Sequence, residues 1–340
     1  MKKLFVVLGV VLCSATLTAC VSFAQKTPEA EVLNGYVGTW KSEAVYKPSK
    51  WFPEGKRWVG TSDVNVKLIL DGNLQQIEIH NDVEQILFIQ RYNQKTNRYE
   101  RWDIHASGIS SYWLGSYNEE AKSMTWKYVD FGSGSSGTIV DQFSEGKVTT
   151  SIIWRQQVLF KDVQGNVLLD GVIERRRTKA ALMGNAAFAQ KSPEAEVLNH
   201  YVGTWKSEGV VKPSKWFPEG KRWVGTHDTK WILDGNLQQM EFYGVLGQTL
   251  AIQRYNQKTN RYERWFIQAS GDSSYWQGSH NEEAKSITWK VVDFGSGSSG
   301  TIVDQFSEGK RTAIILVKDV HGNVLIDGVV ELRRTEQSAE

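Results

Sequence analysis

The chain has 340 residues, which is enough for about two domains that each bury a core of their own. Its 40 Lys and Arg residues nearly balance its 38 Asp and Glu residues, and neither sign forms a long run, so no nucleic-acid partner is indicated. With 14 Trp, 12 Tyr, 13 Phe, 30 Gly and only 6 Pro, the composition is typical of an all-β protein with aromatic packing.

Residues 1–24 have the pattern of an export signal. Lys2-Lys3 precede an apolar run at 4–12, which is shorter than the roughly 20 residues that a membrane-spanning helix needs. Leu17-Thr18-Ala19-Cys20 resembles a bacterial lipobox, so we expect cleavage before Cys20, acylation of its thiol and a lipid anchor in the cell envelope, on the periplasmic side. Ordinary cleavage after Ala24, giving a soluble secreted protein, is the alternative. Both cysteines lie in this segment, so we expect no disulfide in the folded part.

The remainder of the chain is one unit written twice. Residues 28–40 return almost unchanged at 193–205, and the match continues to the end of each half. We therefore predict a first domain at 25–177, a linker at 178–191 and a second domain at 192–335. A deletion before Lys318 is expected to shorten one hairpin of the second domain.

Each domain is expected to begin with a short helix. Thr27-Pro28-Glu29 supplies an N-cap, a proline at the first helical position and an acidic first turn, and Asn34-Gly35 ends the helix. Ser192-Pro193-Glu194 repeats this start. The helix is barely two turns long, and its Val32 and Leu33 can plug an apolar opening.

From residue 36 onward the apolar residues alternate with a period of two, which indicates strands. Short turns rich in Asp, Asn and Gly separate them. The strands expected in the first domain are 36–46, 57–70, 74–81, 86–92, 98–106, 110–117, 123–130, 138–144, 148–161 and 167–176. About ten short strands form an antiparallel meander, and such a meander hides its edges by closing into a barrel. The sequence therefore predicts two tandem all-β meander barrels with a short helix plug, and a two-layer sandwich is the alternative.

Gly38-Thr39-Trp40, repeated at 203–205, resembles the Gly-x-Trp opening of lipocalins and other calycins. The resemblance implies a lipocalin-like barrel in which this tryptophan closes one end and is covered by an arginine of the last strand. The candidates for that arginine are Arg176 or Arg177 in the first domain and Arg333 or Arg334 in the second.

A longer ordered pattern resembles the bacterial family called domain of unknown function 1579. After Gly-Thr-Trp it consists of Leu70-Asp71-Gly72, Tyr92-Asn93, Thr96-Asn97-x-Tyr99 with Trp102, and Gly115-x-Tyr117. Both domains match it, although His280 replaces the last tyrosine in the second. That family has no agreed activity, so the resemblance implies fold and export rather than a reaction.

The histidines give no indication of a metal or haem site shared by both domains, because none of the six occurs in both, and a site private to one domain stays open. We therefore predict no cofactor and no Ser-His-acid triad. The glycine-rich segment at 132–137 has the letters of a dinucleotide fingerprint, but a strand follows it instead of a helix, so we interpret it as a loop at the barrel rim. Recurring carboxylates such as Glu100 could act with Arg or Tyr groups inside the barrel, which keeps an enzyme as an alternative, without assigned catalytic residues.

The segment 51–58, repeated at 216–223, places two tryptophans and a phenylalanine around a Pro-Glu-Gly turn. These rings either fold back to cap the barrel or form an aromatic lip for a ligand. A Trp-rich lip that grips a protein or a glycan is a further alternative.

Strand alternation places Tyr99, Arg101 and Asp103 on one face of their strand. We expect that face to point outward, as a solvated cross-strand ladder. If it points inward, the buried arginine needs an anionic partner, either Asp103 or a ligand carboxylate. We predict a binding protein for a small apolar or amphipathic molecule. The candidate ligand-binding residues are Trp51, Trp58, Arg91, Tyr99, Arg101, Trp113, Trp216, Trp223, Arg254, Tyr262, Arg264 and Trp276.

Overall fold

The computed structural model describes residues 27–59, 63–80, 84–130, 134–145, 152–178, 192–244, 247–292 and 298–335. Outside these ranges lie the export signal with Cys20, most of the linker and residues 131–133 of the glycine-rich region. The backbone of Trp58 is described, but its side chain is not. Within the described part of the chain, no helix has the length and apolar character needed to cross a membrane.

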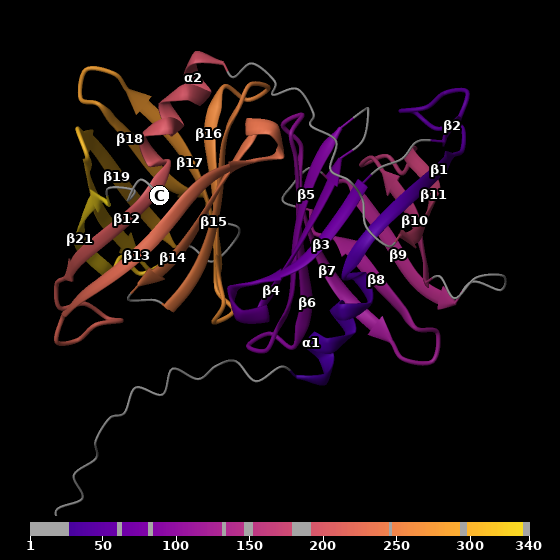
Figure 1. Ribbon diagram of the computed structural model, residues 1–340, viewed down its shortest axis with the longest axis horizontal. Helices are drawn as coiled ribbons and strands as arrows, with labels where there is room; N and C mark the ends of the chain where they lie inside the picture. The colour runs from indigo at the N-terminus through magenta and orange to yellow at the C-terminus, as the bar shows by residue number, and fades with distance from the viewer. Residues whose placement is uncertain are drawn as a thin grey trace, which may run out of the picture.

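The first domain is a closed antiparallel barrel in which the last strand pairs back onto the first (Figure 1). Its strands are β1 (Gly38–Tyr46), β2 (Lys56–Val59), β3 (Asp63–Ile69), β4 (Leu74–His80), β5 (Gln85–Asn93), β6 (Arg98–His105), β7 (Ser110–Asn118), β8 (Ser123–Tyr128), β9 (Ser136–Glu145), β10 (Ile152–Lys161) and β11 (Val167–Thr178). From β3 to β11, each strand pairs with the one that follows it in the chain. Among the described residues, β2 and β3 do not pair with each other; both pair with β1.

The second domain repeats this barrel. Its strands are β12 (Gly203–Val211), β13 (Lys221–Ile232), β14 (Leu237–Gly244), β15 (Gly247–Asn256), β16 (Arg261–Gln268), β17 (Ser273–Asn281), β18 (Ser286–Val292), β19 (Ser299–Ser307), β20 (Lys310–Lys318) and β21 (Val324–Arg334). The β19–β20 hairpin turns between Ser307 and Lys310, so it is the shorter version of the β9–β10 hairpin, as expected. Two tandem antiparallel barrels confirm the predicted fold class.

A short helix plugs one end of each barrel. In the first, α1 (Pro28–Val32) and the 3₁₀ turn η1 (Leu33–Tyr36) follow the Thr27 side chain, which accepts a hydrogen bond from the Ala30 amide at 3.3 Å. Leu33 is buried, and its carbonyl accepts a hydrogen bond from Gln75 at 2.7 Å. In the second, α2 (Pro193–Glu196) and η3 (Val197–Tyr201) repeat the arrangement. The predicted plug is confirmed.

The tryptophan at the start of each barrel lies beneath the predicted arginine. Trp40 is fully buried, and the guanidinium of Arg177 lies 5.1 Å from the centre of its ring. Trp205 and Arg334 repeat the contact at 5.0 Å. The structure thus selects Arg177 and Arg334 from the candidate pairs, and the contact is a cation–π interaction.

The two barrels pack side by side, with α1 and α2 at opposite ends of the molecule (Figure 1). Their contact is apolar and uses the same six positions from each side. The cluster consists of Leu70, Leu74, Leu87, Ile89, Trp102 and Ile104 with Leu233, Leu237, Leu250, Ile252, Trp265 and Ile267. An interface that presents the same residues from both partners has the form of an isologous, two-fold contact.

Hydrogen bonds across the interface repeat the same symmetry. Arg91 donates to the backbone carbonyls of Gln268 and Gly271, and Arg254 donates to those of His105 and Gly108. Gly271 has a φ of +108°, and an added Cβ would lie 2.7 Å from the Asn93 side chain, so both backbone and space require glycine there. The hairpin tip of each barrel therefore docks against an arginine of the other.

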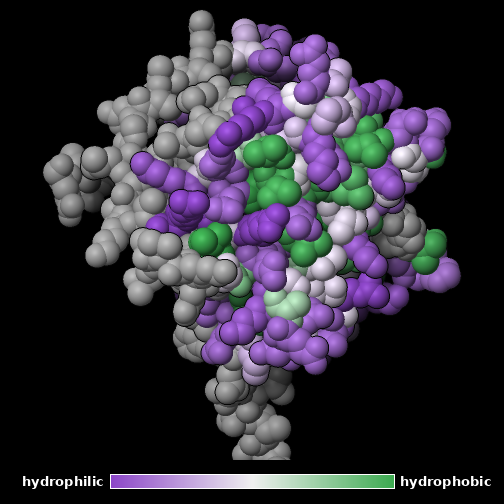
Figure 2. Space-filling view, turned by 90° about the vertical axis from the view of Figure 1, so that its right-hand side faces the viewer, coloured by the Kyte–Doolittle hydropathy of each residue, from purple (hydrophilic) through white to green (hydrophobic). Residues whose placement is uncertain are grey.

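Figure 2 shows the side of the first barrel that faces away from the second, where hydrophobic residues gather near the middle and hydrophilic ones surround them. On the outer strands, Val45 of β1 is 46% exposed and Leu159 of β10 is 36% exposed. Exposed apolar residues are common on protein surfaces, so this face by itself does not identify a partner.

Candidate functional site

The second barrel contains a cavity of about 520 Å³. Its walls are mainly apolar and come from strands all around the barrel. Trp216, Trp223, Phe242 and Trp276 are among the rings that line it, and a polar group of His227, Arg264, Asp304 and Arg311 lines it as well. A concave, largely apolar site with a few converging polar groups is the usual form of a small-molecule site.

The cavity exists because side chains that fill the first barrel have smaller counterparts in the second. Strand register identifies the equivalent positions. Tyr128 lies opposite Trp113 of β7, and Val291 lies opposite Trp276 of β17. Phe160 lies opposite Gly137, and Val317 lies opposite Gly300. In the same way, Ala313 takes the place of Gln156. Three positions on the barrel interior have therefore lost volume without a compensating gain at those positions.

In the first barrel these larger residues form an aromatic cluster. The ring of Phe160 lies 5.0 Å from that of Tyr128, 6.0 Å from that of Trp51 and 6.1 Å from that of Trp113. Trp51, although 52% exposed, thus covers a filled interior and fits the capping interpretation of the aromatic segment.

The same segment behaves differently in the second barrel. Trp216 is also 52% exposed but lines the cavity, together with the partly buried Trp223. Gly209 lies opposite Trp223 in the β12–β13 ladder, and a Cβ there would fall 2.0 Å from the ring. Ala44 holds the equivalent place in the first barrel. The second barrel therefore has an aromatic lip over an open interior.

The plugged end of this barrel is polar. Asp304, buried, accepts hydrogen bonds from the Tyr201 hydroxyl at 2.7 Å, the Trp289 indole at 3.0 Å and Arg264 Nη1 at 3.2 Å. The guanidinium of Arg264 also stacks 3.8 Å from the centre of the Trp289 ring. Burial and the neighbouring Asp304 carboxylate raise the pKa of Tyr201, so the phenol stays protonated and acts as a donor.

Arg311 is the second cation of this group. It is 4% exposed, and its Nη2 lies 3.0 Å from His227 Nε2. Burial, followed by the charges of Arg311 and Arg264, lowers the pKa of His227 well below its ordinary value, so the imidazole is neutral at pH 7 and can accept from Arg311. Burial likewise lowers the pKa of Arg311, against the opposing effect of Asp304.

The first barrel holds a related but balanced group. Asp141 accepts hydrogen bonds from Tyr36, Trp126, Trp154 and Gln156, at 2.7 to 2.9 Å. Two buried arginines face two buried aspartates there: Arg101 pairs with Asp103 at 2.7 Å and lies 3.7 Å from Asp141, and Arg175 lies nearby, 4.1 Å from the Trp154 ring centre.

The expectation that Arg101 points outward is wrong. Arg101 is 1% exposed, and its guanidinium lies inside the barrel, 3.8 Å from the ring of Phe88. Its partner Asp103 lies on the same face of the strand, as alternation requires. Arg264, its counterpart, also points inward, but Phe266 stands where Asp103 stands in the first barrel.

The remaining candidate residues fall into two further places. Tyr99 and Tyr262 hold the plugs, since their hydroxyls donate to the carbonyls of Glu29 and Glu194 at 2.9 Å. Arg91 and Arg254 belong to the interface between the barrels, where their guanidinium groups donate hydrogen bonds to backbone carbonyls of the other barrel. Of the twelve candidates, the cavity brings together Trp216, Trp223, Arg264 and Trp276.

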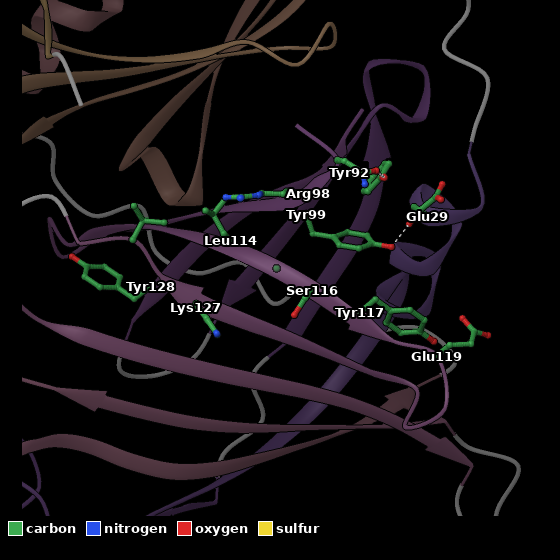
Figure 3. Close-up of a pocket in the computed structure, with 13 residues that line it drawn as sticks. Glu29, Tyr92, Arg98, Tyr99, Leu114, Ser116, Tyr117, Glu119, Lys127 and Tyr128 are labelled. Carbon is green, nitrogen blue, oxygen red and sulfur yellow. Dashed lines mark hydrogen bonds between the residues drawn. The ribbon is translucent and has the colours of Figure 1, made fainter. Parts of the chain in front are cut away.

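A second hollow, of about 720 Å³, lies beside α1 on the first barrel (Figure 3). Tyr99 points across it to Glu29, and Tyr117 and Glu119 border the same side. Its charged residues, Glu29, Arg98, Glu119 and Lys127, are all exposed. Because water screens exposed charges, this groove offers weaker electrostatic binding than the buried polar group of the second barrel.

Three residues of the cavity escaped the sequence analysis: Arg311, His227 and Asp304. Arg311 and His227 have no counterpart of the same type in the first barrel, and the search favoured residues that recur. Within the described ranges, no group of three or more His, Cys, Asp or Glu side chains could hold a metal ion.

No protein-family model and no curated protein matches the sequence, so the resemblance to domain of unknown function 1579 is not confirmed. Solved structures to which the chain shows a weak similarity include a protein of unknown function from the DUF3598 family of Nostoc punctiforme, with 11% identity, a TM-score of 0.31, and coverage of 91% of this chain and 100% of that one. A Bacteroides fragilis protein provisionally named as an outer membrane protein has 11% identity and a TM-score of 0.22, over 90% and 99% of the two chains. Intact Ap-TbpB, with its N and C lobes, has 9% identity and a TM-score of 0.19, over 87% and 76%. Similarity at this level supports no transfer of function.

Proposed function

We propose that this chain is an exported binding protein of the cell envelope and that its second barrel holds a small apolar or amphipathic ligand. The observation that carries the proposal is the cavity of about 520 Å³, which opens at positions where the first barrel has large side chains. The first barrel, with its filled interior, has a supporting role.

The geometry favours binding over catalysis. The buried carboxylate Asp304 accepts three hydrogen bonds at its Oδ2, and the Tyr201 phenol is held as one of the donors. A general base needs a free lone pair directed at the substrate. Oδ2 is committed to structure, and Asp272, the other acidic residue among the described residues that line the cavity, pairs with Lys95.

Refilling the cavity tests the proposal. Val317→Phe with Val291→Tyr installs the residues of the first barrel at two lining positions, and we expect it to abolish binding of the neutral apolar dye N-phenyl-1-naphthylamine, followed by fluorescence titration. Val210→Phe adds the same ring on the outer wall, where the native side chain is 46% exposed, and is the matched control. Unchanged dye binding by the refilled variant would refute the proposed site.

The envelope location rests on the N-terminal signal pattern. We expect the native chain to fractionate with membranes through acylated Cys20, and the Cys20→Ala variant to be released into the soluble fraction. A Cys20→Ala variant that remains membrane-bound would show that the anchor is not at this cysteine.

A further inference from the structure

The plugged end of the cavity carries an excess of positive charge. Arg264 and Arg311 both line the cavity, and their guanidinium carbons lie 4.9 Å and 4.6 Å from the centre of the Tyr201 ring. Among the described residues lining the cavity, two are acidic. Asp304 reaches Arg264, whereas Asp272 is exposed and pairs with Lys95 of the other barrel at 2.6 Å. The neutral His227 adds no charge at pH 7, so this end has two cations and one anion.

The buried charges of the first barrel provide a comparison for this excess positive charge. There the two buried arginines, Arg101 and Arg175, share the interior with two aspartates, Asp103 and Asp141. In the second barrel Phe266 stands at the position of Asp103, so one negative charge has been removed. The number of cations is unchanged, because Leu332 stands at the position of Arg175 and Arg311 at that of Trp154. A buried charge without a counter-charge is costly, which makes this end of the cavity a site for one anion.

Unused hydrogen-bond donors are present in the same group. Arg311 Nε and Nη1 and Arg264 Nη2 are buried and have no acceptor among the described residues, and Arg101 and Arg175 of the first barrel also carry unpaired nitrogen atoms. Those of the second barrel differ in that their side chains line the cavity. A buried donor left unpaired costs more than a paired one gains, so a ligand that supplies an acceptor recovers that free energy.

The cavity is polar at one end and apolar at the other. Arg311 lies 5.6 Å from the ring of Trp205, near the start of β12, whereas Trp216 follows the end of that strand at Val211. Six residues of extended strand separate Trp205 from Val211, or roughly 20 Å. The intervening wall includes Met240, Ile302 and Ile315.

From these observations, and resting on the binding function proposed above, we propose that the ligand of the second barrel is an amphipathic monocarboxylate. Its head group lies against Arg311 and Arg264, and its apolar body runs toward Trp216 and Trp223. A carboxylate supplies one negative charge and two acceptor oxygens, which match the single excess charge and the unused guanidinium donors.

The test compares three ligands with the same ten-carbon tail, decanoate, decanol and decylammonium, by isothermal titration calorimetry on the whole chain. We expect decanoate to bind at least about 10-fold more tightly than decanol, because hydrogen bonds to charged groups contribute about 1.5 to 3 kcal/mol. Decylammonium should bind more weakly than decanol, because the arginines repel it.

Two variants locate the head group. Arg311→Gln should remove the preference for decanoate over decanol, and Phe266→Asp should do the same by restoring the second carboxylate of the first barrel. Arg222→Gln, which changes an exposed arginine of the same barrel, is the control and should keep the preference. Retained decanol binding in each variant shows that the cavity is intact.

The outcomes separate this inference from the function on which it rests. Equal binding of decanoate and decanol by the native chain, or an unchanged preference in both variants, would overturn the carboxylate assignment and leave an apolar binding protein. Failure of all three ligands and of the neutral dye would overturn both proposals.

Discussion

Arg311 occupies in the second barrel the position that Trp154 occupies in the first, each opposite a phenylalanine of the preceding strand. The exchange places a cation where its counterpart packs a fully buried indole against Asp141. A packed aromatic side chain stabilises a core, whereas a buried guanidinium with two unpaired nitrogen atoms does not. The exchange is therefore expected to cost stability, and the ligand proposed above would explain it.

The first prediction concerns that cost. Arg311→Met removes the buried charge and keeps an apolar side chain of similar length, so the free energy of unfolding of the ligand-free protein should rise by about 1 to 3 kcal/mol. Urea denaturation measures it. The exposed Arg222→Met is the control and should change stability by less than about 0.5 kcal/mol. A less stable Arg311→Met variant would contradict the interpretation that the buried charge of Arg311 destabilises the ligand-free protein.

The second prediction is a pH dependence from His227. Its pKa lies well below the ordinary 6.5 in the folded protein, because burial and the cations Arg311 and Arg264 oppose protonation. The unfolded chain therefore takes up a proton below pH 6.5 that the folded chain does not. This contribution to stability is complete above pH 6.5 and is lost, at up to about 1.4 kcal/mol per pH unit, as the pH falls below it.

Replacing His227 by valine, the residue of the first barrel at Val64, should flatten the decline in stability between pH 6.5 and 5. His321→Gln, at an exposed turn, should leave it unchanged. Denaturation curves across this range make the comparison. An identical decline in the valine variant would assign it to other groups.

The third prediction concerns the interface. Arg91→Ala removes the partner of the buried Glu100 carboxylate, 2.7 Å away, and two bonds to the opposite hairpin, so we expect a loss of about 3 to 5 kcal/mol. Lys95→Ala breaks an exposed pair with the same hairpin and should cost at most about 1 kcal/mol. Calorimetric unfolding of both variants gives the comparison. Arg254→Ala should match Arg91→Ala, and a much smaller effect would contradict the two-fold equivalence.

The fourth prediction concerns the aromatic lip. Gly209→Ala places a methyl group against the Trp223 ring, which must move, and overpacking of this kind costs about 1 to 3 kcal/mol. Tryptophan fluorescence should shift as the ring is displaced, and dye binding should weaken. Val210→Ala, on the exposed face of the same strand, should change neither. Unaltered fluorescence in Gly209→Ala would show that the Trp223 ring accommodates the added methyl group without being displaced.

The barrels and the plugs could be predicted because each depends on local pattern: alternation, turn residues and the helix start at Thr27 act over a few neighbours. The Trp–Arg closure was implied by the resemblance to lipocalins, which left Arg176 and Arg177 open, and the structure selects Arg177. The inward direction of Arg101 could not be predicted in this way, because alternation fixes which residues share a face and leaves open which face is inside.

The cavity was beyond sequence reasoning for a related reason. Its volume depends on Val291 of β18 and on Ala313 and Val317 of β20, two strands that come together only in the barrel. The requirement that site residues recur in both copies also directed attention away from Arg311, whose importance lies in its difference from Trp154.

The two-fold contact between the barrels explains how their interiors can differ. Each barrel presents the face that a symmetric dimer of single barrels would use, yet both faces belong to one polypeptide, so their pairing does not depend on protein concentration. One copy can remain densely packed and hold the pair together while the other gives up core volume. If the second barrel binds the proposed ligand, tandem duplication has assigned folding stability to one barrel and binding to the other.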